Sequence, residues 1–527
     1  MSTCQTTQHR LPEDAGNNTA AALGAGGDGL GSNESTALQD DLVILTGDRD
    51  QTDLIAFHLE EKGGSGLNFP HKATAAIADE KLFLHDGTSE NDSATEPIAS
   101  TAAAHCRKRN CFSPILDFVE VLIPYGGLLS NVFSLGSVTL GGGIISMPSS
   151  FQTSGILMAV IYLLVINVIT IYTIVLMGYA IKITGFRNYE EMALGLFGRG
   201  WDYFVGFIVW LSCFGTAVAY ISAVTSLLLP ILEHAPHTPE YLKTDSGQKL
   251  LTSMVWLGLM LPVVIPKRVN SVRYVSAIGV SFVLYFVVCV VVHSCMNGVK
   301  LGMRGNMRYF TSGNEAIYGL SIFVFSFLSQ CITYPVYLEQ RPKPSIKQLT
   351  IAAALSMSIC MVFYIFVGVF GYFDFADDTK AAVLENFDPV HQPYIMVAYV
   401  GMLIKICAAY SMNMIPCRDF VYYCLKWDLD TNPYWKHIIA ITIMALVTLI
   451  CGLFIPSINL ALGLVGSLCG GFIGFIFPVL FWMYCGNWSL RTVGIWHYLA
   501  CYFCIIGGVI AIVWGTIATI YSSFFDV

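Results

Sequence analysis

Three features inside long apolar stretches of the sequence could form a site for a small polar molecule. Two are interruptions of the apolar helical pattern, and the third is a single charged residue. The first interruption is Gly141-Gly142-Gly143, and Ser137 and Thr139 precede it. Three consecutive glycines are poor helix formers, so they favour an unwound backbone whose N–H groups can donate to an anionic ligand. The alternative is close helix packing, although packing glycines usually recur every four residues. We therefore expect a broken helix and a binding site here.

The second interruption is a polar cluster in the apolar stretch that leads to Pro335. The cluster contains Ser326, Ser329 and Gln330. Polar side chains are costly in lipid unless they face protein or water, so the cluster predicts a second broken helix that lines a cavity. It lies five apolar segments after the glycines, as a five-plus-five internal repeat would require. The two halves show no residue-level repeat, so this pairing depends on spacing alone.

Lys405 is the one charge well inside the apolar run Val397–Ala409. A lysine within a membrane span is a functional hypothesis by default. Its ammonium could replace a bound cation or carry a coupling proton. The alternative is a lysine near a helix end that extends to the membrane interface. Lys405 lies near the middle of its segment, which favours the functional interpretation.

The composition is that of a membrane protein. Of 527 residues, 55% are apolar and 12% are charged, against roughly 25% charged residues in soluble proteins. A spanning helix needs about 20 mostly apolar residues. We therefore predict an all-α polytopic membrane protein with about eleven transmembrane helices, at 126–149, 155–181, 203–231, 249–266, 274–296, 316–338, 348–373, 393–416, 437–455, 457–484 and 496–521.

The N-terminal region differs from the rest of the chain. Residues 1–100 hold 17 Asp and Glu but 5 Lys and Arg, with few apolar runs. We predict an acidic, mostly disordered tail at 1–110 and a transmembrane domain at 111–527. Lys and Arg favour cytoplasmic loops, and a cytoplasmic N-terminus gives sixteen of them on the inner flanks against six outside. We therefore expect the N-terminus in the cytoplasm and the acidic loop 374–392 outside.

The sequence lacks the residues that several classes of protein need for their function. There is no Walker-type phosphate loop, and the predicted span cores hold no paired carboxylates, no histidine and no ligands at metal spacing. A channel would show selectivity rings rather than paired helix breaks. The sixteen cysteines form neither a metal cluster nor a disulfide framework. We therefore expect no enzyme activity, no cofactor, no metal and no nucleic-acid partner.

Seven stretches that follow one another along the chain form a recognisable set: Gly141–Pro148, Asn188–Glu191, Phe214–Tyr220, Pro266–Gly279, Phe325–Glu339, Gly371–Phe375 and Pro416–Arg418. Taken in this order, they resemble the amino acid/auxin permease family of the amino acid–polyamine–organocation superfamily. The similarity runs from about Phe112 to the C-terminus and leaves the acidic tail uncovered. That tail and Asn413–Asp419 are similar to the protozoan branch of the family.

The resemblance implies a leucine-transporter-like fold, with ten core helices in a five-plus-five inverted repeat and one extra helix. It implies that an amino acid binds between the broken first and sixth helices. The α-carboxylate would meet the amides of Gly141, Gly142 and Gly143, and the α-amine would meet carbonyls near Ser137 and Ser329. Other residues expected to line the site are Thr139, Phe214, Ala217, Tyr220, Ser326 and Gln330. For Phe214, Ala217 and Tyr220, ordinary packing within the bundle is the alternative.

These features together predict a secondary active transporter that moves amino acids by alternating access. Sodium-coupled members of the family often carry Asn where Ser137 stands, and the family often has His where Gln330 stands. Together with Lys405, these departures favour H⁺ coupling or uniport over Na⁺ symport. Because the predicted span cores lack Asp and Glu, neutral amino acids are favoured over arginine and lysine.

Two questions of context stay open on the sequence. The alternative function is an amino-acid sensor on the same fold that does not transport its ligand. The plasma membrane is the expected location, with an acidic vacuole or lysosome-like organelle as the alternative.

Overall fold

A computed structural model of the protein describes residues 126–236, 239–267, 272–299, 307–429, 431–486 and 488–524. The predicted tail at 1–110 lies outside these residues. Within them every regular element is a helix and no strand occurs. Ten helices are long and apolar enough to cross a membrane, or up to eleven if a bent pair counts as one more span. The predicted all-α membrane fold with about eleven transmembrane helices is confirmed.

The first span is the bent pair. It consists of α4 (Leu128–Thr139), then η1 (Gly142–Ser146) and α5 (Met147–Ser154), with a bend of 50° between the two halves. Leu140 and Gly141 lie between the halves, outside any helix. The break predicted at the glycines is therefore present.

Nine of the other ten spans follow the predicted segments within about four residues. The eighth was predicted to end at Pro416, but its helix continues through this proline to Leu425. The sixth is interrupted after Ser326, which confirms the second predicted break. In chain order they are α6 (Ile156–Thr184), α8 (Trp201–His234), α10–η2–α11 (Asp245–Val264), α12 (Val272–His293) with η3 (Ser294–Val299), α13 (Asn314–Ser326) with η4 (Gln330–Ile332) and α14 (Thr333–Leu338), α15 (Ile346–Phe375), α16 (Pro393–Leu425), α17 (Tyr434–Phe454), α18–η7–η8–α19 (Ile458–Cys485), and α21–η9–α22 (Ile495–Phe524).

Short helices connect some of the spans, and one of them shows how local sequence starts a helix. α7 (Tyr189–Phe197) follows Asn188, whose side chain accepts a hydrogen bond of 2.7 Å from the Glu191 N–H. The Glu191 carboxylate in turn accepts one of 2.9 Å from the Arg187 N–H. These reciprocal bonds satisfy N–H groups that a helix start leaves free. The other short helices are α9 (Glu240–Lys243), η5 (Ala376–Asp378), η6 (Val383–Asn386) and α20 (Leu490–Val493).

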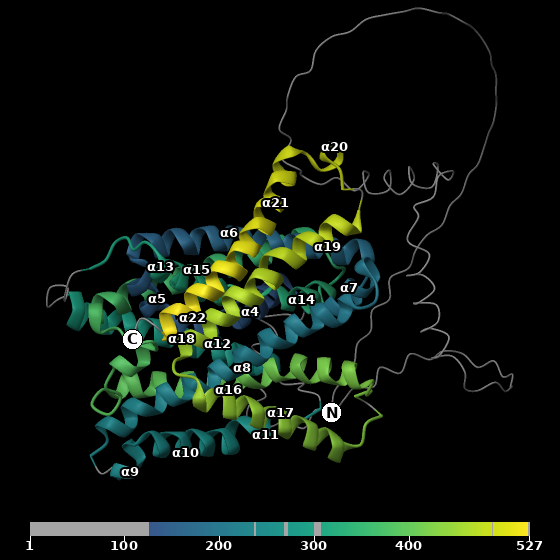
Figure 1. Cartoon of the computed structure of the whole chain (residues 1–527). Helices are drawn as coiled ribbons and strands as arrows, with labels where there is room; N and C mark the ends of the chain where they lie inside the picture. The colour runs from purple at the N-terminus through teal and green to yellow at the C-terminus, as the bar shows by residue number, and fades with distance from the viewer. Residues whose placement is uncertain are drawn as a thin grey trace, which may run out of the picture. The chain divides into compact units, whose positions relative to one another are not determined.

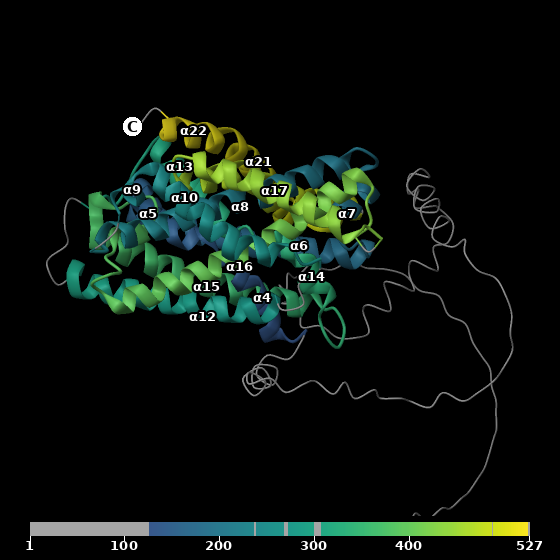
Figure 2. The ribbon, with the colours of Figure 1, turned by 90° about the horizontal axis from the view of Figure 1, so that it is seen from below.

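The two broken spans lie inside the bundle (Figure 1). α4 packs on α15, α5 packs on α13, and η1 contacts both α8 and α13. Seen from below, α12 and α15 lie on one side of the bundle, whereas α21 and α22 lie on the opposite side (Figure 2). The interruptions therefore face other helices rather than lipid, as irregular backbone within a membrane requires.

A stripe of glycines lets the tenth span approach α13 closely. A β-carbon at Gly466 would lie 2.0 Å from the carbonyl oxygen of Ser321, and one at Gly470 would lie 2.6 Å from Val324 Cγ1. Gly474 continues the same face next to Gln330. These glycines recur every four residues, as is typical of glycines that let two helices pack closely.

We predict that Gly466→Ala lowers the free energy of unfolding by about 2 kcal/mol, because the added methyl meets backbone that cannot move aside. Thermal unfolding of the detergent-purified protein measures the change. Gly507→Ala is the matched control, since a β-carbon at Gly507 meets no atom within 4 Å. Equal stability of the two variants would contradict the packing role.

Candidate functional site

The two breaks touch each other at Gly143 and Ser326. A β-carbon at Gly143 would lie 2.2 Å from Ser326 Oγ and 3.2 Å from Ser326 Cα. Ser326 is the last residue of α13, and Gly143 is the second residue of η1. Only glycine leaves room for this approach, so the third glycine of the run joins the first and sixth spans.

The first two glycines lie under Tyr220 of α8. A β-carbon at Gly141 would be 2.7 Å from the Tyr220 hydroxyl oxygen, and one at Gly142 would be 2.9 Å from Tyr220 Cε1. Gly142 begins the continuous helical run of η1 and α5. The N–H groups at such a start carry a partial positive charge that attracts anions. The structure therefore brings Tyr220 to the place predicted for an anionic group.

The C-terminal ends of the two preceding half-helices also converge. Thr139 ends α4 and Ser326 ends α13. The hydroxyl of Tyr364, which is fully buried on α15, lies 2.6 Å from the Thr139 carbonyl oxygen and 2.9 Å from the Ser326 carbonyl oxygen. Sequence reasoning missed Tyr364, because it stands in an apolar and aromatic run without any special spacing.

Lys405 of α16 reaches the first broken span. Its ammonium donates hydrogen bonds to the Ser137 carbonyl oxygen at 2.8 Å and to Ser137 Oγ at 3.0 Å. The side chain is buried, and its stem passes Gly279, where a β-carbon would lie 2.7 Å from Lys405 Cδ. In the part of the chain that the structure describes, Lys405 forms no salt bridge. Lys405 therefore binds inside the bundle instead of extending to the interface.

Gln330 holds the second break in place. Its amide donates to Thr173 Oγ1 of α6 at 3.2 Å and to the Gly474 carbonyl oxygen at 3.5 Å, and its Oε1 accepts from the Ser329 N–H at 3.1 Å. Gln330 thus links the sixth span to the second and the tenth. These bonds occupy both ends of its amide group.

The sulfur of Met357 on α15 contacts a hydroxyl group from each of the two breaks. Its sulfur lies 3.9 Å from Thr139 Oγ1 and 3.8 Å from Ser329 Oγ. Each hydroxyl also bonds a backbone carbonyl of its own segment, at Leu135 and Phe327. Met357 was missed too, since a methionine in an apolar span gives no signal.

The remaining predicted residues are on α8. The Phe214 ring stacks on Trp210 at a centroid distance of 5.0 Å, and Ala217 is fully buried. Their place in a side-chain pocket stays a prediction.

The loop 374–392, which we name the lid, covers the breaks from one end of the bundle. Its residues Ala382, Val383, Leu384 and Phe387 are buried, and η6 contacts α5, η1 and α8. Ser149 Oγ donates to the Ala381 carbonyl at 3.2 Å, and the Gln152 amide donates to the Asp377 carbonyl at 2.9 Å. Access to the breaks from that end therefore requires the lid to move.

Histidines hold both ends of the lid. His293 of α12 pairs with Asp374, where the lid begins. His391 Nδ1 lies 2.6 Å from Asp388 Oδ2 near the other end, and His234 of α8 lies 3.9 Å from the same oxygen. Partial burial opposes ionisation of Asp388, but the hydrogen bonds from His391 prevail and lower its pKa. Asp388 therefore stays ionised and available to these pairs at neutral pH.

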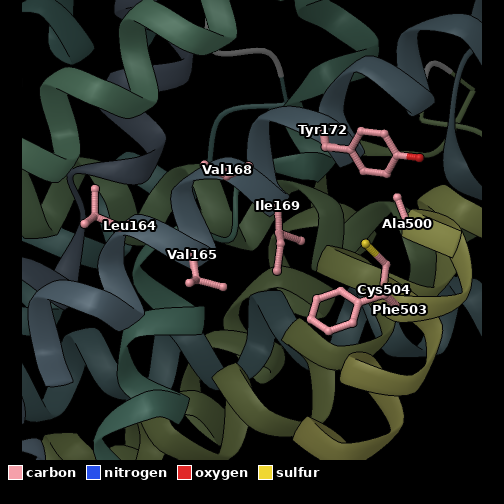
Figure 3. Close-up of a pocket in the computed structure, with 8 residues that line it drawn as sticks. All are labelled: Leu164, Val165, Val168, Ile169, Tyr172, Ala500, Phe503 and Cys504. Atoms are coloured by element: carbon pink, nitrogen blue, oxygen red, sulfur yellow. The ribbon is translucent and has the colours of Figure 1, made fainter. Parts of the chain in front are cut away.

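Other binding places are less suited to a polar ligand. An apolar groove of about 510 Å³ lies between α6 and α21, lined by Leu164, Val165, Val168, Ile169, Tyr172, Ala500, Phe503 and Cys504 (Figure 3). Its lining carries one hydroxyl and no charge, so it fits lipid chains better than a charged solute. Among the described residues, no three His, Cys, Asp or Glu side chains are grouped to hold a metal ion.

Comparisons with known proteins give two findings. The family described as transmembrane amino acid transporter protein matches this chain over residues 126–521. A solved structure of Mhp1, a nucleobase-cation-symport-1 family transporter in a closed conformation with bromovinylhydantoin bound, is similar with a TM-score of 0.49 and 13% sequence identity. That match covers 75% of this chain and 90% of that chain. The family match includes both breaks, Tyr364 and Lys405.

We predict that Gly143→Ala lowers the free energy of unfolding by about 2 kcal/mol, because the added methyl forces the two breaks apart. Ser326→Gly in the same chain removes the two side-chain atoms that the methyl meets but leaves the Cα at 3.2 Å, so it should recover about half of that loss. Thermal unfolding of both single variants and the double variant gives the coupling between the positions. Gly258→Ala, with open space around it, is the control. Strictly additive effects would show that the breaks do not touch.

Proposed function

Since this chain belongs to the transmembrane amino acid transporter family, and is therefore a membrane transporter, we propose that it carries neutral amino acids by alternating access. The observation that carries this proposal is the convergence of opposite helix ends at the two breaks. The N–H start of η1 lies at Gly142, and the carbonyl ends of α4 and α13 lie at Thr139 and Ser326. An amino-acid zwitterion has the complementary pair of charges.

Each charge of the zwitterion has a proposed partner. The α-carboxylate accepts from the N–H groups of Gly142 and Gly143, with the Tyr220 hydroxyl beside them. The α-ammonium donates to the carbonyls of Thr139 and Ser326. The sequence-based prediction placed the ammonium near the Ser137 carbonyl, but Lys405 already donates to that oxygen at 2.8 Å. The ammonium site is therefore proposed two residues closer to the break, at carbonyls that the Tyr364 hydroxyl bonds in the described conformation.

A neutral side chain suits the charges around the site. Lys405 has no salt bridge among the described residues, and its ammonium would repel the side chain of arginine or lysine. A buried cation needs a carboxylate or several oxygens to offset its desolvation. These considerations support neutral substrates over cationic ones.

The proposed coupling ion is a proton carried by Lys405. The two hydrogen bonds from its ammonium to Ser137 tie α16 to α4. A neutral amine is a weaker donor than an ammonium, so loss of the proton would loosen this tie and free α4 to move. Sodium is less suited, because the ammonium occupies the carbonyl that such an ion would need.

Orientation and location complete the proposal. The charge distribution supports a cytoplasmic N-terminus, which puts the lid on the outer face and makes the described conformation closed to the outside. The plasma membrane is the proposed location, with an acidic organelle as the alternative.

We expect proteoliposomes that contain this protein to take up radiolabelled alanine, proline or glutamine in a saturable way, and arginine and lysine more slowly. An inward proton gradient should accelerate uptake, whereas a sodium gradient should not. Protein-free liposomes are the control. Amino-acid binding without any flux would contradict transport and favour the sensor.

We predict that Lys405→Met abolishes the acceleration by a proton gradient, because no group then loads the proton. Lys405→Arg keeps the charge but does not release its proton, so net uptake should fall by about tenfold or more while substrate binding changes little. Uptake and equilibrium binding in the same preparations measure both effects. Lys347→Met, an exposed lysine at the start of α15, is the matched control. A preserved proton response in Lys405→Met would exclude Lys405 as the proton carrier.

A further inference from the structure

We propose that Tyr364 substitutes for the substrate ammonium while the transporter carries no substrate, and that it thereby allows the unloaded transporter to return across the membrane. This inference rests on the proposed function. It assigns to Tyr364 a positioning role that determines whether the protein performs net uptake or only exchange.

The Tyr364 hydroxyl lies between the two breaks. Tyr364 Oη lies within hydrogen-bond distance of the terminal carbonyls of both half-helices, at 2.6 Å from Thr139 and 2.9 Å from Ser326. The ring is fully buried, and Phe327 packs edge-on against it with a centroid distance of 5.4 Å. The hydroxyl therefore has a fixed place between the two breaks.

The two carbonyls need a donor whenever they converge. The last carbonyls of a helix carry a partial negative charge of about half an elementary charge. Two such ends that point at one place repel each other, and each buried carbonyl left without a donor is costly. The Thr139 carbonyl also accepts from the Gly141 N–H at 2.8 Å. In the described part of the chain, Tyr364 is the donor found for the Ser326 carbonyl.

Neighbouring side chains do not duplicate this role. Lys405 donates to Ser137 rather than to Thr139 or Ser326. Met357 lies near hydroxyls of both breaks, but a thioether has no hydrogen to donate.

A bound amino acid changes this requirement. Its ammonium has three N–H donors, so it can satisfy both carbonyls by itself. The loaded transporter then closes without the tyrosine hydroxyl. Every alternating-access cycle of net uptake includes a return without substrate, and in that step no substrate ammonium is present. Loss of the hydroxyl should therefore slow the unloaded return and spare the loaded steps.

The test is Tyr364→Phe in proteoliposomes, with labelled substrate outside and no pH difference. Net uptake into vesicles without internal substrate should fall by about tenfold or more, because the unloaded return then lacks the donor that Tyr364 provides to the buried Ser326 carbonyl. Exchange into vesicles preloaded with unlabelled substrate uses only loaded steps and should stay within about twofold of wild type. Tyr372→Phe on the same helix is the matched control, since its hydroxyl accepts from the Arg308 N–H at 3.2 Å and, among the described residues, bonds neither break. Both of its fluxes should match wild type.

Equal loss of net uptake and exchange in Tyr364→Phe, or no change in either, would overturn the inference. If the variant is recovered folded only when substrate is present during purification, the inference is supported, because the substrate ammonium then replaces the missing donor. If it cannot be recovered in either condition, the hydroxyl is structural and the inference fails. Failure of the proposed function looks different, since wild-type protein would then show neither flux.

Discussion

A helix that breaks inside a membrane must find new partners for the backbone groups that the break releases, and the centre of this protein is built around that constraint. Neighbouring helices supply side chains for these groups: the single hydroxyl of Tyr364 on α15 lies within hydrogen-bond distance of the Thr139 and Ser326 carbonyls, and Lys405 of α16 donates to the Ser137 carbonyl. Thr173 of α6 accepts from the Gln330 side chain, which holds the second break against α6. Apolar burial places these helices, but the hydrogen bonds determine how far along one another they can slide. The hydrogen bonds at the breaks therefore set the register of α15 and α16 against the broken spans.

The same constraint explains why such a centre suits transport. Tyr364 and Lys405 each bond carbonyls that we propose for the substrate ammonium or for a cation, so under the proposed function the protein contains substitutes for its ligands. Exchange of one donor for another costs little, because the number of satisfied carbonyls stays the same. The lid adds a second control at one end of the bundle, where its buried apolar residues cover α5 and η1. Movement of the lid and exchange of donors at the breaks can then be linked through η1, which contacts both the lid and α13.

Sequence reasoning succeeded where a feature can be recognised in the sequence alone. Length and apolarity marked the spans, three adjacent glycines marked the first break, and an isolated charge marked Lys405. It failed where the role depends on a partner from another helix. Tyr364 looks like any aromatic residue of an apolar span, and only the tertiary structure shows two carbonyls beside its hydroxyl. Nothing in the sequence indicated that the Ser137 carbonyl accepts from Lys405 or that the Gln330 amide joins α6 and the tenth span. That Ser137 and Gln330 line the substrate site stays a prediction.

The two central hydrogen-bond donors, Tyr364 and Lys405, differ in whether they can lose the hydrogen that they donate. A tyrosine hydroxyl keeps its hydrogen throughout the physiological pH range, so under the proposed function its bonds to Thr139 and Ser326 respond to substrate. Under the proposed proton coupling, the ammonium of Lys405 gives its proton to water once the bundle opens, and its bond to Ser137 responds to proton supply. Both side chains bond the first broken span, at carbonyls two residues apart in α4. The proposal therefore needs a single moving half-helix to couple substrate and proton movement.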